Sequence, residues 1–97
     1  MPHQQDWFVY ILRCADGSLY TGISTDVARR LIEHNAGAPH GARYTRVRRP
    51  VALVYCEGAC NRSAALRRER QVKGLDRAGK LALIARFDMA GIAMLPD

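Results

Sequence analysis

The chain has 97 residues and a mass of 10.8 kDa, so we expect one domain over residues 1–97, with no room for a second. Hydrophobic residues make up 48% of the chain and charged residues 25%, which argues against disorder, and no apolar run is long enough to span a bilayer. The net charge of +6 and the pI near 9.8 point to a polyanionic partner, for which nucleic acid is the leading candidate.

Two strands joined by a tight turn are predicted near the N-terminus. Residues 7–14 (WFVYILRC) are rich in aromatic and β-branched types, and residues 19–24 (LYTGIS) read as a second, antiparallel strand after an Asp-Gly turn. Closing the hairpin at this turn would offset Tyr10 from Tyr20 by about three or four residues. Gly22, inside the second strand, indicates a place where something must approach the backbone closely.

Three helices and one more strand follow the hairpin. Each predicted helix begins at a residue that can cap its N-terminus, and the first two end close to a glycine. The helices run from Thr25 or Asp26 to about Asn35, from Asn61 or Ser63 to Gly74, and from Asp76 to about Phe87. A loop over residues 37–50 and a third strand over residues 51–56 (VALVYC) separate the first two helices.

The order β-β-α-β-α-α predicts the fold class α/β (α+β), with a small sheet flanked by helices. Residues 88–97 (DMAGIAMLPD) have no clear period, so we expect a loosely ordered tail there. The N-terminus has neither the basic region nor the long apolar stretch of a signal peptide, which favours a cytoplasmic protein without a membrane partner. We expect it to be a monomer or a weak dimer.

The positive charge is concentrated in residues 29–80, which hold thirteen basic and four acidic residues. Most of the basic residues are arginines, whose forked guanidinium groups bind phosphate oxygens in pairs. We expect the loop within this segment to bind nucleic acid, with Tyr44 available to stack on a base. The basic residues of the loop are Arg43, Arg46, Arg48 and Arg49. An arginine-rich surface that is simply solvated would give the same composition.

The three cysteines, Cys14, Cys56 and Cys60, are an odd number in a chain without a signal peptide, which argues against a disulfide framework. Cys56 and Cys60 are four residues apart, but no second pair of cysteines or histidines follows at the spacing of a zinc ribbon. We therefore expect the cysteines to be small buried hydrophobic residues.

One carboxylate does not suit an ordinary amphipathic helix. When the residues of the second helix are placed at intervals of about 100°, Glu69 falls between Ala65 and Val72, in the middle of the apolar stripe. A carboxylate on a buried face is costly unless it is paired or holds a metal ion. The pattern leaves two alternatives, which are a metal ligand and a structural ion pair with a neighbouring arginine.

The first helix carries an unusual pair of polar residues. Its apolar stripe is predicted at Val27, Ala28, Leu31 and Ile32. Arg30 and His34 flank this stripe one turn apart, so they can act on one ligand, whereas Arg29 points to solvent. An amphipathic helix whose rim happens to carry an arginine and a histidine would look the same.

Together these residues resemble the signature of the GIY-YIG nuclease superfamily. Its first element appears as Phe8-Val9-Tyr10, with Phe in place of the leading Gly, and its second as Tyr20-Thr21-Gly22, with Thr in place of Ile. Arg30 and His34 stand where the family carries its helix arginine and a His or Tyr, and Glu69 matches its metal-binding glutamate. The segments YILRCADGSLYTGIS, ARYTR and ALRRERQVKGL resemble the small stand-alone bacterial branch of YhbQ-like proteins.

The resemblance covers about residues 7–85 and implies a three-stranded antiparallel sheet with helices packed around it. It also implies an endonuclease or phosphodiesterase, a hydrolase that cuts phosphodiester bonds in DNA, in DNA repair or processing, with a single Mg²⁺ or Mn²⁺. A downstream asparagine of some family members has no counterpart in this chain.

The catalytic residues that the resemblance implies are Tyr10, Tyr20, Arg30, His34 and Glu69. Glu69 would hold the metal ion, and Arg30 would bind the scissile phosphate. Tyr10, Tyr20 and His34 would position or deprotonate the attacking water, and the sequence leaves open which of them takes the proton. Gly22 would let the backbone approach the phosphate. The other expected nucleic-acid-binding residues are Arg43, Tyr44, Arg46, Arg48, Arg49 and Lys73.

Two further functions stay open at this point. One is a nucleic-acid-binding module of the same fold without catalysis, and the other is a basic structural protein of the translation machinery. The intact set of five candidate catalytic residues favours the nuclease, because a pure binding module has no need of an inward-facing carboxylate. DNA is the expected partner, and RNA is not excluded.

Overall fold

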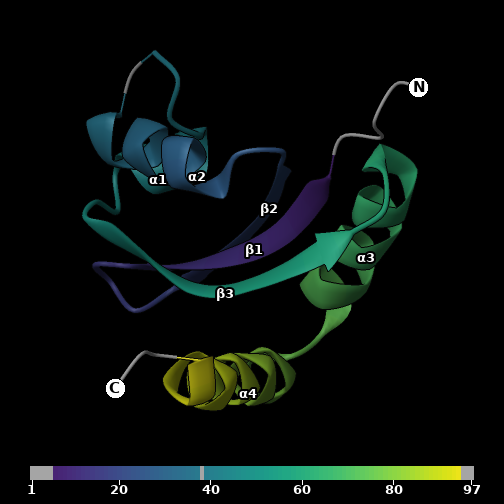
Figure 1. The fold of residues 1–97 in the computed structure, drawn as a ribbon. Coiled ribbons are helices and arrows are strands. Elements are labelled where there is room, and N and C mark those ends of the chain that lie inside the picture. The colour runs from purple at the N-terminus through teal and green to yellow at the C-terminus, as the bar shows by residue number, and fades with distance from the viewer. Residues whose placement is uncertain (1–5, 38, 95–97) are drawn as a thin grey trace.

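The computed structural model describes residues 6–37 and 39–94, and in that range it contains three strands and four helices (Figure 1). In chain order they are β1 (Trp7–Cys14), β2 (Leu19–Ser24), α1 (Val27–Ala36), α2 (Arg43–Arg46), β3 (Val51–Ala59), α3 (Arg62–Gly74) and α4 (Arg77–Met94). This is the predicted β-β-α-β-α-α arrangement with one short helix, α2, added to it.

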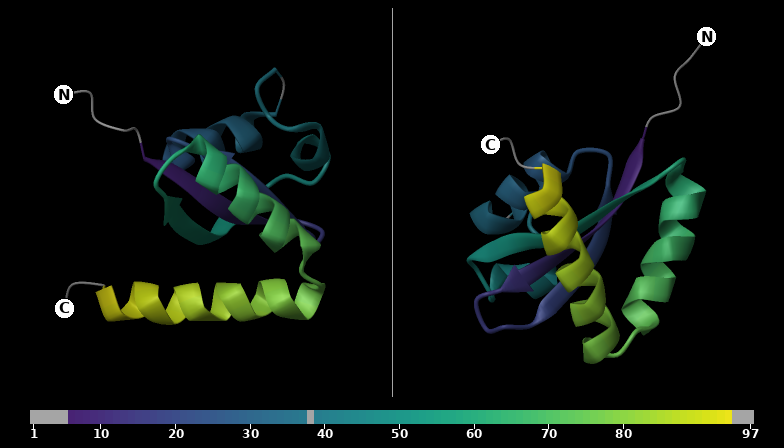
Figure 2. Two further views of the ribbon diagram at one scale, coloured as in Figure 1. Left: turned by 90° about the vertical axis from the view of Figure 1, so that its right-hand side faces the viewer. Right: turned by 60° about the horizontal axis from the view of Figure 1, so that its bottom comes forward.

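The three strands form one antiparallel sheet in the order β2-β1-β3, so β1 is the central strand and pairs with both neighbours. Successive side chains of a strand point to opposite faces of the sheet. Helices cover both faces, because α1 and α2 lie on one side of the sheet and α4 lies on the other (Figure 1). A short turn joins α3 to α4 (Figure 2).

The two faces of the sheet carry separate apolar clusters. On the face covered by α3 and α4, the buried residues are Val9, Ile11, Tyr55, Ala65, Val72 and Ile84. On the face covered by α1, they are Tyr10, Leu12, Cys14 and Val51. The odd-numbered residues of β1 therefore build the core with α3 and α4, while the even-numbered residues meet α1.

The hairpin of β1 and β2 has a different register from the predicted one. Tyr10 pairs with Gly22, and the two tyrosines are offset by two residues rather than by three or four. The reason lies in the turn, where Gly17 has a φ of 84° and the N–H of Cys14 donates to the carbonyl of Ser18 at 2.9 Å. These features close a three-residue loop that ends on a left-handed glycine. Because the offset is even, both tyrosines point to the same face.

Gly22 makes room for the ring of Tyr10. A Cβ atom on Gly22 would lie 2.6 Å from Oη and 2.7 Å from Cζ of Tyr10. Cβ atoms in proteins essentially never approach other heavy atoms this closely. The close approach predicted from the sequence is therefore made by a side chain of the neighbouring strand. Contact between Gly22 and a phosphate stays a prediction.

Three element boundaries differ from the predicted ones. The third strand does not stop at residue 56, since β3 goes on pairing with β1 as far as Ala59. Residues 43–46 of the predicted loop form the helix α2. The last helix does not end near Phe87, because α4 continues to Met94 through a stretch rich in helix-favouring alanine and methionine. The rest of the predicted tail, residues 95–97, lies outside the described residues. No helix within the described range is long and apolar enough to cross a membrane.

The expectation of buried cysteines is correct for one of the three. Cys14 is buried on the face of the sheet that meets α1, and Cys56 is half-buried in β3. Cys60 is exposed, because it follows the last residue of β3 at the point where the chain leaves the sheet.

Replacing Gly22 by alanine tests the close packing of the hairpin. We expect Gly22→Ala to lower the free energy of unfolding by about 1–3 kcal/mol, because the added methyl group must displace the Tyr10 ring. Gly58→Ala is the matched control, since Gly58 lies in β3 of the same sheet and a Cβ there meets nothing nearer than 4.0 Å. Urea denaturation measures both variants, and equal stability would contradict the role assigned to Gly22.

Candidate active site

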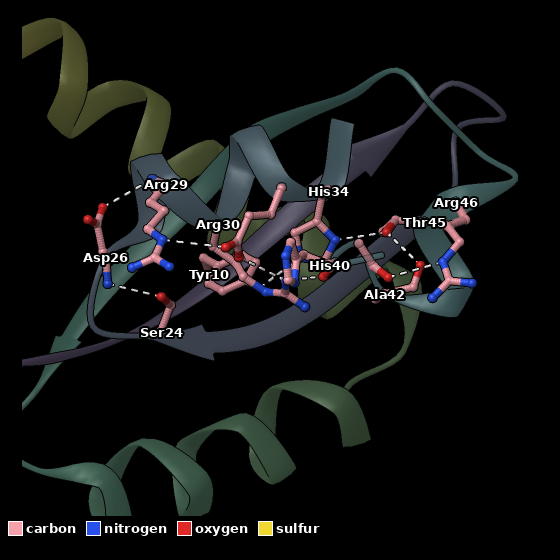
Figure 3. A network of polar contacts seen from close by, with 12 residues as sticks. Tyr10, Ser24, Asp26, Arg29, Arg30, His34, His40, Ala42, Thr45 and Arg46 are labelled. Carbon is pink, nitrogen blue, oxygen red and sulfur yellow. Dashed lines mark hydrogen bonds and ion pairs between the residues drawn. The ribbon is translucent and has the colours of Figure 1, made fainter. Parts of the chain in front are cut away.

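The even-numbered face of the hairpin brings both signature tyrosines under α1. Tyr10 is 1% exposed, and its Oη lies 3.0 Å from Nε2 of His34 (Figure 3). Tyr20 packs edge-on against the same imidazole, with 5.1 Å between the two ring centroids. His34 of α1 therefore contacts a tyrosine from each strand of the hairpin.

His34 is completely buried, and each of its ring nitrogens has a partner. Nε2 faces Tyr10, and Nδ1 lies 2.8 Å from Oγ1 of Thr45 in α2. Burial, followed by the positive charge of Arg30, lowers the pKa of His34 from 6.5 to about 4. The imidazole is therefore neutral at neutral pH, so one of its nitrogens donates a hydrogen bond and the other accepts one.

The buried face of α1 is not the predicted apolar stripe. Ile32 is 70% exposed and Ala28 is also exposed, whereas His34 lies at the centre of the interface with the sheet. Val27 and Leu31 do pack on the sheet, so the helix is turned toward the side that carries His34. The reason is that both polar atoms of the imidazole are hydrogen-bonded, which removes the usual cost of burying them.

Arg30 lies on the inner side of α1, and Arg29 lies on the outer side, as predicted. The side chain of Arg30 is 26% exposed, and its Nη1 donates to Glu33 Oε1 at 3.1 Å and to the carbonyl oxygen of His40 at 2.6 Å. Arg29 is 76% exposed and pairs with Glu33 at 3.4 Å. Arg30 thus links α1 to the loop that follows it, close to Tyr10 (Figure 3).

Glu69 lies on α3 and not on the elements that carry the other candidate residues. Its side chain is 17% exposed, and its Oε2 lies 3.5 Å from Nζ of Lys73, so its ion-pair partner is a lysine and not an arginine. The pKa of Tyr10 is raised to about 12, first by burial and then by the neighbouring Tyr20, and the Glu69 carboxylate adds to the rise.

Glu69 suits a hard divalent cation that is held by a single protein oxygen group. Among the side chains that the structure describes, those of residues 6–37 and 39–87, no group of three or more His, Cys, Asp or Glu could enclose a metal ion in the way of a caged zinc or calcium site. Mg²⁺ keeps several of its own waters and takes one or two carboxylates. A largely buried carboxylate such as Glu69 fits that manner of binding.

The basic loop uses several of its arginines to hold its own shape. Arg46, Arg48 and Arg49 each donate to a main-chain carbonyl within residues 41–46, at distances between 2.8 and 3.2 Å. Arg43 is exposed at the start of α2. The predicted binding of phosphates by this loop would therefore rest on Arg43 and on the donors that the other arginines have left.

Tyr44 already makes stacking contacts inside the protein. The ring of Tyr44 stacks on that of Tyr20, with 5.9 Å between the two ring centroids. The guanidinium carbon of Arg48 lies 3.9 Å from the centroid of the Tyr44 ring. Stacking of Tyr44 on a base, as predicted, would compete with these two contacts. Tyr44 instead extends an aromatic series that begins at His34 and passes through Tyr20.

Thr45 is the site residue that sequence reasoning missed. It is completely buried, although it lies in the short helix α2, and its hydroxyl contacts His34. A helix of four residues has no amphipathic repeat, so hydrophobic periodicity could not mark its buried position. The one indication in the sequence was that the segment ARYTR belongs to the family resemblance.

Known proteins resemble this chain over most of its length. Residues 6–82 match the family described as the GIY-YIG catalytic domain. A UPF0213 protein of Desulfotalea psychrophila is 58% identical over 78 residues, which cover 80% of this chain and 70% of that protein. A UPF0213 protein of Natronomonas pharaonis is 52% identical over 80 residues, which cover 82% of this chain and 92% of that protein.

Two structures determined by solution NMR share the fold. A protein of E. faecalis has a TM-score of 0.60 and 40% identity, and the match covers 92% of this chain and 93% of the other. The UPF0213 protein of Bacillus halodurans has a TM-score of 0.52 and 44% identity, and the match covers 82% and 83% of the two chains. In both comparisons the shared fold therefore covers at least 82% of this chain.

The buried neutral imidazole makes stability depend on pH in a defined direction. Between pH 6.5 and about 4 the unfolded chain protonates His34 and the folded chain does not, so acid favours unfolding. We expect His34 to account for a loss of up to about 3 kcal/mol as the pH falls through this window. Urea denaturation at several pH values measures the loss.

Two variants isolate the contribution of His34. His34→Gln removes the titrating group, so its stability should fall less steeply between pH 6.5 and 4 than that of the wild type. His40→Gln removes an exposed histidine and should keep the wild-type slope. A slope in His34→Gln that equals the wild-type slope would show that His34 is not buried in the neutral form.

Proposed function

Because the chain belongs to the GIY-YIG catalytic-domain family, and within it to the UPF0213 proteins, we propose that it is a metal-dependent nuclease that hydrolyses phosphodiester bonds in DNA. The observation that carries the proposal is the buried hydrogen bond of 3.0 Å between Tyr10 Oη and the neutral His34. A hydroxyl held against a neutral imidazole is suited to proton transfer.

In this proposal Tyr10 takes the proton from the attacking water. Its pKa of about 12 keeps the hydroxyl protonated at neutral pH, so it does not act as a free phenolate. It acts as a relay, in which Oη receives a proton from water while it passes its own proton to Nε2 of His34. Nε2 of His34 faces Oη of Tyr10, so the proton that His34 accepts comes from Tyr10. The positive charge of Arg30 lowers the pKa of the donor Tyr10 and also that of the acceptor His34.

Arg30 and Tyr20 position the reacting groups. The hydrogen bonds of Arg30 to Glu33 and to His40 both use Nη1, so the remaining donors of the fork can meet oxygens of the scissile phosphate. Charge grows on these oxygens in the transition state, and a fixed guanidinium stabilises it. Tyr20 packs on His34 and, on the same face as Tyr10, helps to orient the water.

Glu69 provides the carboxylate for Mg²⁺ or Mn²⁺. When bound there, the ion would stabilise the negative charge that develops on the leaving oxygen. Lys73, which pairs with the carboxylate at 3.5 Å, is then free to contact the DNA backbone. Arg43, Tyr44, Arg46, Arg48 and Arg49 belong to the same proposed binding surface, on the side of the sheet that carries α1 and α2 (Figure 1).

A cleavage assay on several nucleic acids tests the proposed function. The purified chain is incubated with single-stranded, duplex and branched DNA and with RNA of the same sequence, with Mg²⁺ or with a chelator. We expect Mg²⁺-dependent cleavage of at least one DNA, and we expect Tyr10→Phe to lose it because the relay hydroxyl is gone. Binding to these nucleic acids without cleavage of any would favour a non-catalytic module.

Arg30 and Arg29 form a matched pair for testing the phosphate contact. Arg30→Ala should reduce the cleavage rate by about 100- to 1,000-fold, which corresponds to the loss of one donor to the transition state. Arg29→Ala should cleave at nearly the wild-type rate, because its side chain is 76% exposed. Single-turnover rates at saturating protein make the comparison. Equal losses in the two variants would place the phosphate elsewhere.

Replacing Glu69 by glutamine tests the metal ligand. Glu69→Gln keeps the size of the side chain and removes the negative charge, so we expect Mg²⁺-dependent cleavage to fall at least about 100-fold while the chain stays folded. Asp6→Asn, which removes an exposed carboxylate before β1, is the control for overall charge. Mg²⁺ titration by calorimetry gives a second readout. A Glu69→Gln variant that binds Mg²⁺ as the wild type does would rule out Glu69 as the ligand.

A further inference from the structure

We propose that Thr45 is a positioning residue, which holds His34 in the tautomer that accepts the proton of Tyr10; this inference rests on the proposed nuclease function. Three contacts form one continuous chain from the buried tyrosine to the main chain of the loop (Figure 3). They join Tyr10 Oη to His34 Nε2 at 3.0 Å, His34 Nδ1 to Thr45 Oγ1 at 2.8 Å, and Thr45 Oγ1 to the carbonyl oxygen of Ala42 at 3.1 Å.

The direction of these hydrogen bonds follows from the last of them. The carbonyl of Ala42 can only accept, so the single hydroxyl proton of Thr45 points toward it. Oγ1 of Thr45 must then accept from Nδ1 of His34, which therefore carries the ring proton. Nε2 of the neutral ring is left without a proton and accepts the hydrogen bond of Tyr10.

The opposite tautomer satisfies fewer groups. If Thr45 donated to Nδ1, then Nε2 would carry the ring proton and would donate to Tyr10. The proton of the Tyr10 hydroxyl, in a side chain that is 1% exposed, would then lose its acceptor on His34. Every buried polar side-chain atom in the described part of the chain has a hydrogen-bond partner, which favours the arrangement that satisfies all of them.

A hydroxyl at this position does something that a carboxylate would not. The groups that face His34 are Tyr10 of β1, Tyr20 of β2, Arg30 and Glu33 of α1, and Thr45 of α2. An aspartate in place of Thr45 would also fix the tautomer, but its charge would raise the pKa of His34 and favour the protonated ring. Thr45 orients the imidazole and leaves it neutral, as a proton acceptor for Tyr10 must be.

The test compares three variants of the full chain. Thr45→Val keeps the shape of the side chain and removes the hydroxyl, whereas Thr45→Ser keeps the hydroxyl. Thr21→Val is the matched control, since Thr21 is another buried threonine, 5% exposed, on the sheet face that meets α3. Nitrogen-15 NMR of histidine-labelled protein reports which ring nitrogen carries the proton, and His34→Gln identifies the His34 signals. Cleavage rates on DNA and urea denaturation complete the comparison.

We expect the wild type, Thr45→Ser and Thr21→Val to show His34 protonated at Nδ1 and to cleave at similar rates. In Thr45→Val, His34 should populate both tautomers. The variant should cleave about 10- to 100-fold more slowly than the wild type when the rates are compared at the same concentration of folded protein. A wild-type ring protonated at Nε2 would overturn the assignment even if Thr45→Val fails to fold, as would wild-type cleavage by a folded Thr45→Val. A wild type that shows the Nδ1 proton but cleaves no nucleic acid would overturn the nuclease function, and the direction of the hydrogen bonds would stand.

Discussion

The hydrogen bond between Tyr10 and His34 is the contact on which the rest of this side of the molecule depends. It joins the central strand to α1, and it requires the imidazole at the middle of the helix–sheet interface, which turns Ile32 out to solvent. The same tyrosine ring lies across β2 and excludes any side chain at Gly22. One polar pair therefore determines the rotation of a helix and the residue type on a neighbouring strand.

Polar contacts extend this order from α1 into the loop that follows it. Arg30 holds the carbonyl of His40, and His34 holds Thr45, so two successive turns of α1 fix the basic loop at two points. Asn35 connects α1 to the first residue of β3, just after this loop, because its amide donates to the carbonyl of Val51 at 3.0 Å and accepts from the N–H of Val51 at 2.8 Å. The surface proposed to meet DNA is thereby tied to the residues proposed to cut it.

The sequence predicted those features of the structure that depend on residues close together along the chain. The bounds of β1 and β2, the caps at Asp26 and Asn61, and the inward position of Glu69 all follow from local pattern. The hairpin register and the buried face of α1 do not, because the first depends on one left-handed residue in the turn and the second on hydrogen bonds to distant partners. The role of Thr45 could not be predicted for the same reason, since no residue near it in the sequence indicates that its hydroxyl contacts His34.

The alternation of side chains along β1 has a consequence for how such a protein can change over generations. Val9 and Ile11 anchor the sheet to α3 and α4, while Tyr10 and Leu12, between and beside them, face α1. Apart from Glu69 of α3, the residues proposed for the chemistry and the residues that anchor the fold are thus interleaved in sequence but lie on opposite faces of one sheet. Selection can alter the face that is proposed to meet the substrate while the opposite face keeps the chain folded, so a domain of this size can acquire a new specificity without first losing its architecture.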